Sequence, residues 1–398
     1  MKMKEKLWTR IFILALIITI GVNLACNLLL STISIYAKQV TNVDTYAGIM
    51  TGAFTLAALF IRIVAGKMLD KIGRRKVLVF GVGVTVLSTI AYLFTNNINM
   101  IIILRVMQGI GFGISSTAIA TIVTDVTPES RMLEGIGYSG VGITITTAIG
   151  PSIALALVGK DYESFNLLFI VTSLVALFTI LLSFRLSYKE NTKVKDIKKE
   201  AIVIEEKGIN ISRIIVPSTV LFLAAVAEST ILAFTALYGI ELGFSNIGLF
   251  FTINAIGILS SRLFINRIVN KLGTNIVVSC GVVIFAASIF GMAVSKSYGM
   301  LIIMGFLCGV MVGSLLPIVN LLIIDSVSKT NRGMANAIYY ALIDGGYGIG
   351  SIIWGQVAAI SGYRSIYAYS AVALIMAFLI FILNIVYCKR KNNEALKC

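Results

Sequence analysis

The chain contains no histidine. Without an imidazole group it cannot form a Ser-His-Asp triad or a histidine-based metal site, so proton transfer would have to use carboxyl, tyrosine or lysine groups. The five cysteines show no CxxC spacing and indicate no disulfide framework. The sequence also has no P-loop for binding ATP. We therefore expect a protein that is not an enzyme and that holds neither a metal nor another cofactor.

Charged residues are also scarce, at 13% of the 398 residues, whereas apolar residues make up 58%. The mean hydropathy of +0.96 is far above that of a soluble domain. A helix that crosses a bilayer needs about 20 apolar residues, so this composition supports roughly a dozen spans. The sequence therefore predicts an all-α integral membrane protein with little room for a soluble domain.

Apolar runs separated by short polar breaks predict twelve transmembrane helices. The expected spans are about 11–36, 46–66, 77–95, 99–122, 134–157, 164–186, 214–237, 244–266, 275–295, 299–324, 334–357 and 364–388. The first run lacks a small-residue cleavage site, so we expect it to be a retained span. We expect two six-helix bundles, at 1–186 and 214–398, joined by a hydrophilic linker at 187–213.

The positive charges follow the predicted topology. The formal net charge is +15, which in a soluble protein would suggest nucleic-acid binding. Here 25 lysines and arginines fall on the side of the two termini and the linker, and the opposite side has three, Lys38, Lys160 and Lys296. The positive-inside rule therefore predicts cytoplasmic termini in a plasma-membrane protein, with the lipid bilayer as a partner and no nucleic acid.

The chain also resembles itself at an offset of 200 residues. The register continues without gaps through much of spans two to five and eight to eleven, which indicates parallel repeats. The matched pairs are Gly48/Gly248, Arg62/Arg262, Lys71/Lys271, Gly73/Gly273, Gly81/Gly281, Gly109/Gly309, Gly113/Gly313, Asp125/Asp325 and Gly150/Gly350.

Two motifs resemble those of a known family. The loop after the second span reads Gly66-Lys-Met-Leu-Asp70-Lys-Ile-Gly73-Arg74-Arg75, and it is similar to motif A of the major facilitator superfamily. The stretch Arg105-Val-Met-Gln-Gly-Ile-Gly in span four resembles motif B of the same family. The resemblance covers nearly the whole chain. It implies a transporter whose two halves rock around a site near the membrane midplane, within the twelve-span proton-coupled efflux branch.

This resemblance implies a cytoplasmic gate between the halves. An acid at a helix end can cap the positive N-terminus of a facing helix, and the neighbouring cations can meet acidic partners or anionic lipid. The second half has Asn270 where the first has Asp70, so the gate is expected to be asymmetric. For the basic residues the alternative is ordinary positive-inside topology. The gate residues are Gly66, Asp70, Gly73, Arg74, Arg75, Asp125 and Arg131.

Span five carries a face of small residues that ends in Gly150-Pro151. The pair resembles motif C of antiporters, although Ser152 and the apolar residues after it replace further glycines. The resemblance favours export in exchange for protons. The alternative is that these small residues only allow close packing of helices.

Three charged residues lie deep inside predicted spans: Glu228, Asp344 and Arg105. A charge near the middle of the bilayer costs on the order of 2.5 to 3.5 kcal/mol on insertion scales, so each is a functional hypothesis. Burial favours the neutral form of a carboxyl group, which would let either acid carry a proton as access alternates. For Arg105, the resemblance to motif B implies a role in coupling. The alternatives are a structural ion pair or hydrogen bond for each acid, and a bond to backbone carbonyls for Arg105.

Polar side chains in other spans are candidates to line a substrate cavity. For each of them, hydrogen bonding between helices is the alternative. The candidates are Asn23, Asn27, Tyr36, Tyr138, Asn254, Asn320, Tyr340 and Tyr347.

Taken together, the sequence predicts a proton-coupled antiporter that exports a small organic compound by alternating access, as a monomer. A symporter that imports a small organic solute remains the alternative within transport. A non-transporting receptor or scaffold is a more distant alternative, because it would not explain Glu228, Asp344 and the motif A loop.

Overall fold

The computed structural model describes residues 6–159, 165–188, 211–244, 246–327 and 332–395. All regular secondary structure in these ranges is helical, which confirms the predicted fold class. The chain forms two compact units, with unit 1 comprising Met1–Ile204 and Ser245–Gly248, and unit 2 comprising Glu205–Phe244 and Leu249–Cys398. Most of the predicted linker at 187–213 lies outside the described residues, so the predicted domain boundaries stay a prediction.

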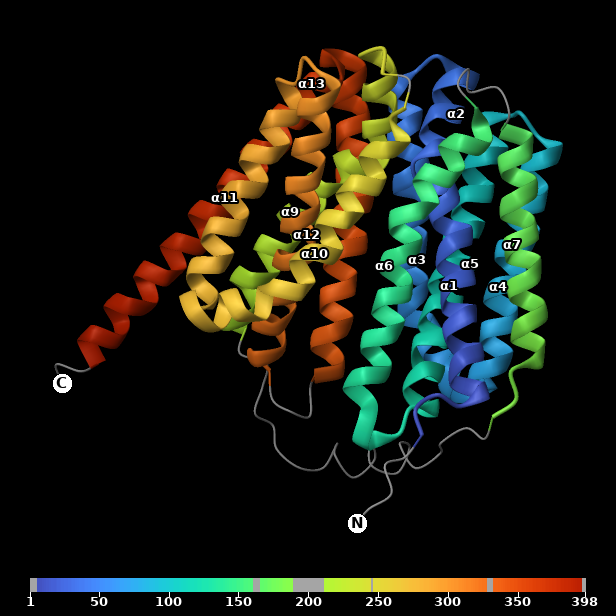
Figure 1. The fold of residues 1–398 in the computed structure, drawn as a ribbon, viewed down its shortest axis with the longest axis horizontal. Coiled ribbons are helices and arrows are strands. Elements are labelled where there is room, and N and C mark those ends of the chain that lie inside the picture. The colour runs from blue at the N-terminus through green and yellow to red at the C-terminus, as the bar shows by residue number, and fades with distance from the viewer. Residues whose placement is uncertain (1–5, 160–164, 189–210, 245, 328–331, 396–398) are drawn as a thin grey trace. The chain divides into compact units, whose positions relative to one another are not determined.

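Each unit is built from long apolar helices (Figure 1). Those of unit 1 are α1 Arg10–Leu30, α2 Thr32–Thr41, α3 Asp44–Ile72, α4 Arg74–Ala91, α5 Ile98–Val126, α6 Met132–Val158 and α7 Phe165–Arg185, with the 3₁₀ turns η1 Tyr92–Phe94 and η2 Glu129–Arg131. Those of unit 2 are α9 Ile211–Glu241, α10 Gly248–Leu272, α11 Thr274–Ala293, α12 Tyr298–Asp325 and α13 Arg332–Ala395.

The described helices contain eleven segments that are long and apolar enough to cross a membrane. The last of them, Ala337–Tyr387, has 51 residues and covers both of the final predicted spans. Gly362 interrupts this segment with a φ of 77°, a left-handed conformation that glycine adopts without steric cost. Two helices therefore follow each other within α13, which agrees with the spans predicted at 334–357 and 364–388.

The 200-residue repeat is also visible in the helix boundaries. Helices α4 and α11 both begin one residue after a glycine of positive φ, which is 98° at Gly73 and 83° at Gly273. A residue with a side chain would be strained at this positive φ. Both halves therefore have glycine at the equivalent turn. Helix α5 begins at Ile98 and α12 at Tyr298, again 200 residues apart.

The repeat extends to individual contacts between helices. A Cβ atom at Gly109 of α5 would overlap the carbonyl oxygen of Phe54 in α3, and one at Gly309 of α12 would overlap the carbonyl oxygen of Asn254 in α10. The residue numbers of the second contact are those of the first plus 200, since 109 and 54 become 309 and 254. Glycine is thus required at both positions because backbones meet there, the usual means of close helix packing in lipid.

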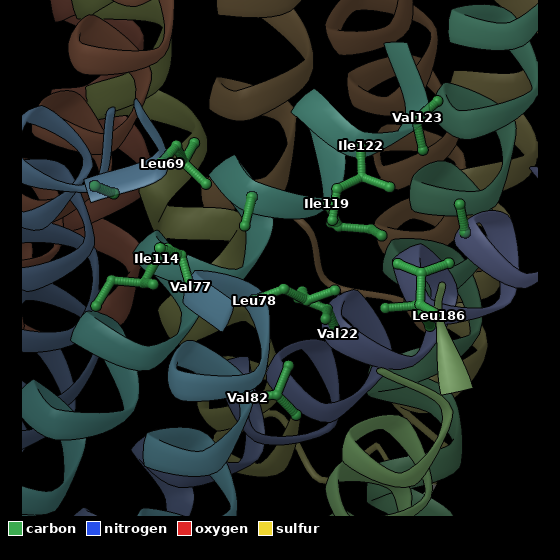
Figure 2. Packing of buried hydrophobic residues seen from close by; sticks show 14 of the residues in the cluster. Val22, Leu69, Val77, Leu78, Val82, Ile114, Ile119, Ile122, Val123 and Leu186 are labelled. Atoms are coloured by element: carbon green, nitrogen blue, oxygen red, sulfur yellow. The ribbon is translucent and has the colours of Figure 1, made fainter. Parts of the chain in front are cut away.

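The core of unit 1 joins α1, α4 and α5 through branched aliphatic side chains (Figure 2). Val22 from α1 meets Leu78 and Val82 from α4, and Ile119 comes from α5. Val22 and Val82 are both at most 5% exposed. These contacts hold together the helices that carry the polar residues described below.

We expect Gly109→Ala and Gly309→Ala each to lower the thermal stability of the purified protein. The added methyl group would push two backbones apart, and overpacking of this kind costs about 1–3 kcal/mol. Gly137→Ala is the matched control, because no atom lies within 4 Å of its Cβ position. The readout is the temperature at which the monodisperse peak in size-exclusion chromatography is lost. Equal midpoints for all three variants would contradict the assigned contacts.

Candidate functional site: buried charges in the two units

Arg105 lies in α5 of unit 1 with no solvent exposure. Its Nε donates to the carbonyl oxygen of Met50 at 3.1 Å, and its Nη1 donates to Oε1 of Gln108 at 2.7 Å. The guanidinium carbon lies 4.5 Å from the ring centroid of Phe54, a cation–π distance. The described residues form no ion pair with Arg105, so neutral oxygens and one aromatic face stabilise this buried charge.

Two residues that the sequence analysis did not propose as site residues complete this cluster. Gln108 accepts a second hydrogen bond at 3.3 Å from the hydroxyl group of Tyr92, which follows α4. Gln108 stands three residues after Arg105, a spacing that places both on one helix face and is readable in the sequence. Tyr92 gave no comparable signal. We call Arg105, Gln108, Tyr92 and Phe54 the Arg105 cluster.

In unit 2, small residues bring α13 close to α9 and so determine where Glu228 lies. A Cβ atom at Gly346 would lie 2.6 Å from Cβ of Ala225, and one at Gly350 would lie 2.9 Å from the carbonyl oxygen of Val226. The indole nitrogen of Trp354 donates to that same carbonyl at 2.8 Å. The spacing of Gly346 and Gly350 is the small-xxx-small pattern of tightly packed membrane helices.

This packing places Tyr347 of α13 next to Glu228 of α9, and their side chains are hydrogen-bonded. Glu228 is 8% exposed, and among the described residues its Oε2 has no hydrogen-bond partner. No ion pair found in the described part of the chain involves Glu228. Glu228 is therefore a buried acid without a cationic partner among the described residues. Arg105 is the opposite case in charge, a buried cation without an anionic partner there.

Three more groups lie near the pair formed by Glu228 and Tyr347. Asp344 is half-buried, lies three residues before Tyr347 and acts electrostatically on its hydroxyl group. Tyr339 and Cys308 lie within electrostatic range of Glu228 as well. The structure thus brings together three predicted site residues, Glu228, Asp344 and Tyr347. We call these three, with Tyr339, the Glu228 cluster.

The remaining cavity candidates are found in separate places. Asn27 donates to the hydroxyl groups of Thr146 and Thr147 at 3.4 and 3.5 Å, and Asn254 donates to the carbonyl oxygen of Gly305 at 2.8 Å. All three bonds join two helices, which is the alternative weighed for these residues. Their contact with substrate stays a prediction.

Three of the other candidates lie in unit 1 and make different contacts. Asn23 donates to the carbonyl oxygen of Thr19 in its own helix, and Tyr36 donates to Asn96 at 3.1 Å. Tyr138 is exposed and its ring lies 4.7 Å from that of Trp8. None of these contacts reaches the Arg105 cluster.

The last two candidates lie in unit 2. Tyr340 is 54% exposed and its ring lies against that of Tyr339. Asn320 is half-buried in α12, and among the described residues its Oδ1 has no hydrogen-bond partner. An unsatisfied buried amide oxygen is costly, so Asn320 is the polar candidate with the most to gain from a bound ligand.

The motif A residues form a network at the helix ends of unit 1. Arg74, at the start of α4, makes an ion pair with Asp125 near the end of α5, where the Asp125 side chain is only 6% exposed. The hydroxyl group of Tyr188, which follows α7, donates to Asp125 at 3.2 Å. Arg75 donates to the carbonyl oxygen of Phe184 in α7. The network therefore ties α4, α5 and α7 together.

The other predicted gate residues lie at the margin of this network. Arg131 forms an exposed ion pair with Glu134 at 2.5 Å, and the hydrogen bond that it donates to this carboxylate raises the pKa of Arg131. Gly66 is exposed in α3, and Gly73 makes the turn into α4. The backbone of Asp70 belongs to α3, but its side chain lies outside what the structure describes. A gating role for these residues stays a prediction.

The family of this chain follows from its similarity to known proteins. The family model of the Major Facilitator Superfamily matches residues 11–248 and again 218–396. The chain belongs to the Major Facilitator Superfamily. This membership confirms the resemblance drawn from the motif A and motif B residues, and it makes the protein a multi-pass membrane transporter of small molecules by family and fold.

Curated relatives of this superfamily member include efflux proteins. It is 25% identical to the staphylopine export protein of Staphylococcus aureus over 84% of this chain and 87% of the relative. It is 26% identical to the multi-drug resistance efflux pump PmrA homolog of Lactococcus lactis over 87% of this chain and 85% of the relative. Export is thus the activity named for two relatives that align over most of their length.

Solved structures of the superfamily share the fold. A bacterial homolog of the human lysosomal transporter Spinster, inward-facing and occupied, matches with a TM-score of 0.79 and 13% identity over 96% of this chain and 97% of its own. The nucleoside transporter NupG matches with a TM-score of 0.75 and 13% identity over 95% of this chain and 99% of its own. At these identities the likeness establishes the fold alone.

We expect Asp125→Asn to destabilise the transporter far more than Glu134→Gln. The first change leaves the nearly buried Arg74 without its anion, and hydrogen bonds to charged groups contribute about 1.5–3 kcal/mol. The second removes an exposed pair of the kind that contributes about 0–1 kcal/mol. Thermal unfolding in detergent measures both. A Glu134→Gln midpoint as low as that of Asp125→Asn would contradict the assigned network.

Proposed function

We propose that the protein is a proton-coupled antiporter that exports a small organic compound. The observation that carries the proposal is Glu228, a buried acid near the middle of α9 with no cationic partner among the described residues. An isolated charge in an apolar medium is costly, so such a carboxyl group is more stable when it holds a proton. An arriving cationic or polar substrate group makes the ionised form favourable again.

The neighbours of Glu228 suit this exchange. Tyr347 is hydrogen-bonded to Glu228 and lies within electrostatic range of Asp344, so the charge of either acid acts on the same hydroxyl group. Release of the proton requires substrate to bind the site, and the reverse holds by linkage. Proton entry and substrate exit are thereby coupled in opposite directions.

The relatives support export rather than import. The names of the staphylopine export protein and the multi-drug resistance efflux pump PmrA homolog both state an outward direction. The stretch Arg62-Ile-Val-Ala-Gly66 also resembles a branch of exporters that includes metallophore and sugar efflux proteins. We infer that the substrate is a small organic compound with a cationic or zwitterionic group that can pair with Glu228.

Alternating access requires two parts of the protein that move relative to each other. We propose that residues 1–186 and 214–398 act as two bundles that rock against each other, with the linker and both termini in the cytoplasm. The protein would sit in the plasma membrane as a monomer. Arg74, Asp125 and their neighbours would form the cytoplasmic gate, with Arg105 assisting the coupling from unit 1.

The first test is proton release from the detergent-purified protein when a cationic or zwitterionic compound is added. The probes are a panel of quaternary ammonium dyes and amino-carboxylate metallophores, and binding is measured separately by calorimetry. We expect the wild type to release protons with each compound that binds. Glu228→Gln should release none, because an amide cannot give up the proton.

Two further variants make the result interpretable. Glu134→Gln removes an exposed acid in unit 1 and should release protons like the wild type. Tyr347→Phe should keep binding but release fewer protons, since it removes the hydrogen bond that stabilises the ionised form of Glu228. Binding without proton release in the wild type would overturn proton exchange. Substrate and protons moving in the same direction in liposomes would favour import by symport instead.

A further inference from the structure

Unit 2 carries an apolar groove between α11 and the second half of α13, which run alongside each other (Figure 1). Its volume of about 460 Å³ lies within the range of about 300–1,000 Å³ that is usual for small-ligand sites. Val283, Ala287 and Phe290 line it from α11, and Tyr369, Val372 and Ile375 line it from α13. We call it the α11–α13 groove.

The groove is open to the surface of the protein. Phe290 and Val372 are each 51% exposed although they line it from opposite helices. The only polar side-chain atom among the described lining residues is the hydroxyl group of Tyr369. An apolar hollow of this kind fits a hydrocarbon chain better than a polar solute.

One end of the groove carries a positive charge. Arg364 stands one helical turn before Ala368, a lining residue, so both lie on the same face of α13. The exposed guanidinium group of Arg364 is hydrogen-bonded to Tyr238. The hydroxyl group of Tyr238 donates at 3.1 Å to the carbonyl oxygen of Met292, two residues beyond Phe290. Arg364 is thereby fixed at the end of the groove where α11 ends.

A guanidinium group has five N–H donors. Within the described part of the chain, the hydrogen bond with Tyr238 is the one that Arg364 makes, so most of its donors face no acceptor there. The fork geometry of arginine matches the oxygens of a phosphate. An apolar channel that ends at a fixed arginine therefore has the two parts that recognise an anionic phospholipid: a place for a chain and a place for the headgroup.

We propose that the α11–α13 groove binds a single anionic phospholipid of the bilayer, with one acyl chain in the groove and the phosphate on Arg364. This inference concerns a different part of unit 2 from the Glu228 cluster and does not depend on the direction or coupling of transport.

Native mass spectrometry of the purified full chain tests this proposal. The protein is loaded from detergent micelles with dioleoylphosphatidylglycerol or, in parallel, with the same amount of dioleoylphosphatidylcholine. We expect one phosphatidylglycerol to be retained at a collision energy that removes phosphatidylcholine. Arg364→Gln should reduce retention of phosphatidylglycerol to that of phosphatidylcholine. Ala287→Phe, which fills the groove, should reduce retention of both lipids.

Two controls keep the outcomes distinct. Lys38→Gln removes a positive charge from unit 1 and should leave the selectivity unchanged, so a general effect of net charge is excluded. Tyr238→Phe keeps the arginine and should retain phosphatidylglycerol better than Arg364→Gln does. Each variant is first shown to be monodisperse with the wild-type unfolding midpoint. The proposal is overturned if correctly folded Arg364→Gln or Ala287→Phe protein holds phosphatidylglycerol as tightly as the wild type.

Discussion

The absence of water in the bilayer is the constraint on which the rest of this structure depends. Backbone groups must be satisfied within helices, which accounts for a described chain that is helical wherever it is regular. Lipid is as apolar as leucine, so hydrophobicity does not drive the helices together, and they associate through close backbone contact instead. Gly109, Gly309 and Gly346 are among the points where that contact occurs.

The same constraint makes every buried charge in this transporter conspicuous, and each is treated differently. Asp125 is paired with Arg74 and Tyr188, so it is fully compensated and acts as a fastening between helices. Arg105 is compensated by neutral oxygens and an aromatic ring. Glu228 has the least compensation, because among the described residues Tyr347 alone bonds to it. The degree of compensation agrees with the role proposed for each residue. The compensated Asp125 holds helix ends together, whereas the less compensated Glu228 lies within a span and is proposed to exchange a proton.

The two halves share a backbone plan but not its chemistry. Arg105 corresponds to Gly305 at the repeat offset, Leu28 to Glu228, and Thr144 to Asp344. Even the paired contact at positions 54 and 254 differs, since Phe54 stacks on Arg105 while Asn254 donates to the carbonyl oxygen of Gly305. Duplicated packing with divergent side chains gives one unit a buried cation and the other a buried acid.

The sequence by itself determined the membrane class, the spans, the 200-residue repeat and the family, because hydropathy, glycine spacing and the motif A and motif B residues are local features of the chain. It also predicted that Glu228 and Tyr347 would matter, but it did not predict that they would meet. Only the tertiary structure decided which partner each polar group finds, such as Asn96 for Tyr36. The physical reason is that these helices are apolar on all sides, so periodicity does not show which face meets which neighbour. Interlocking of glycines and side chains fixes that choice, as it does for Gly346 on Ala225.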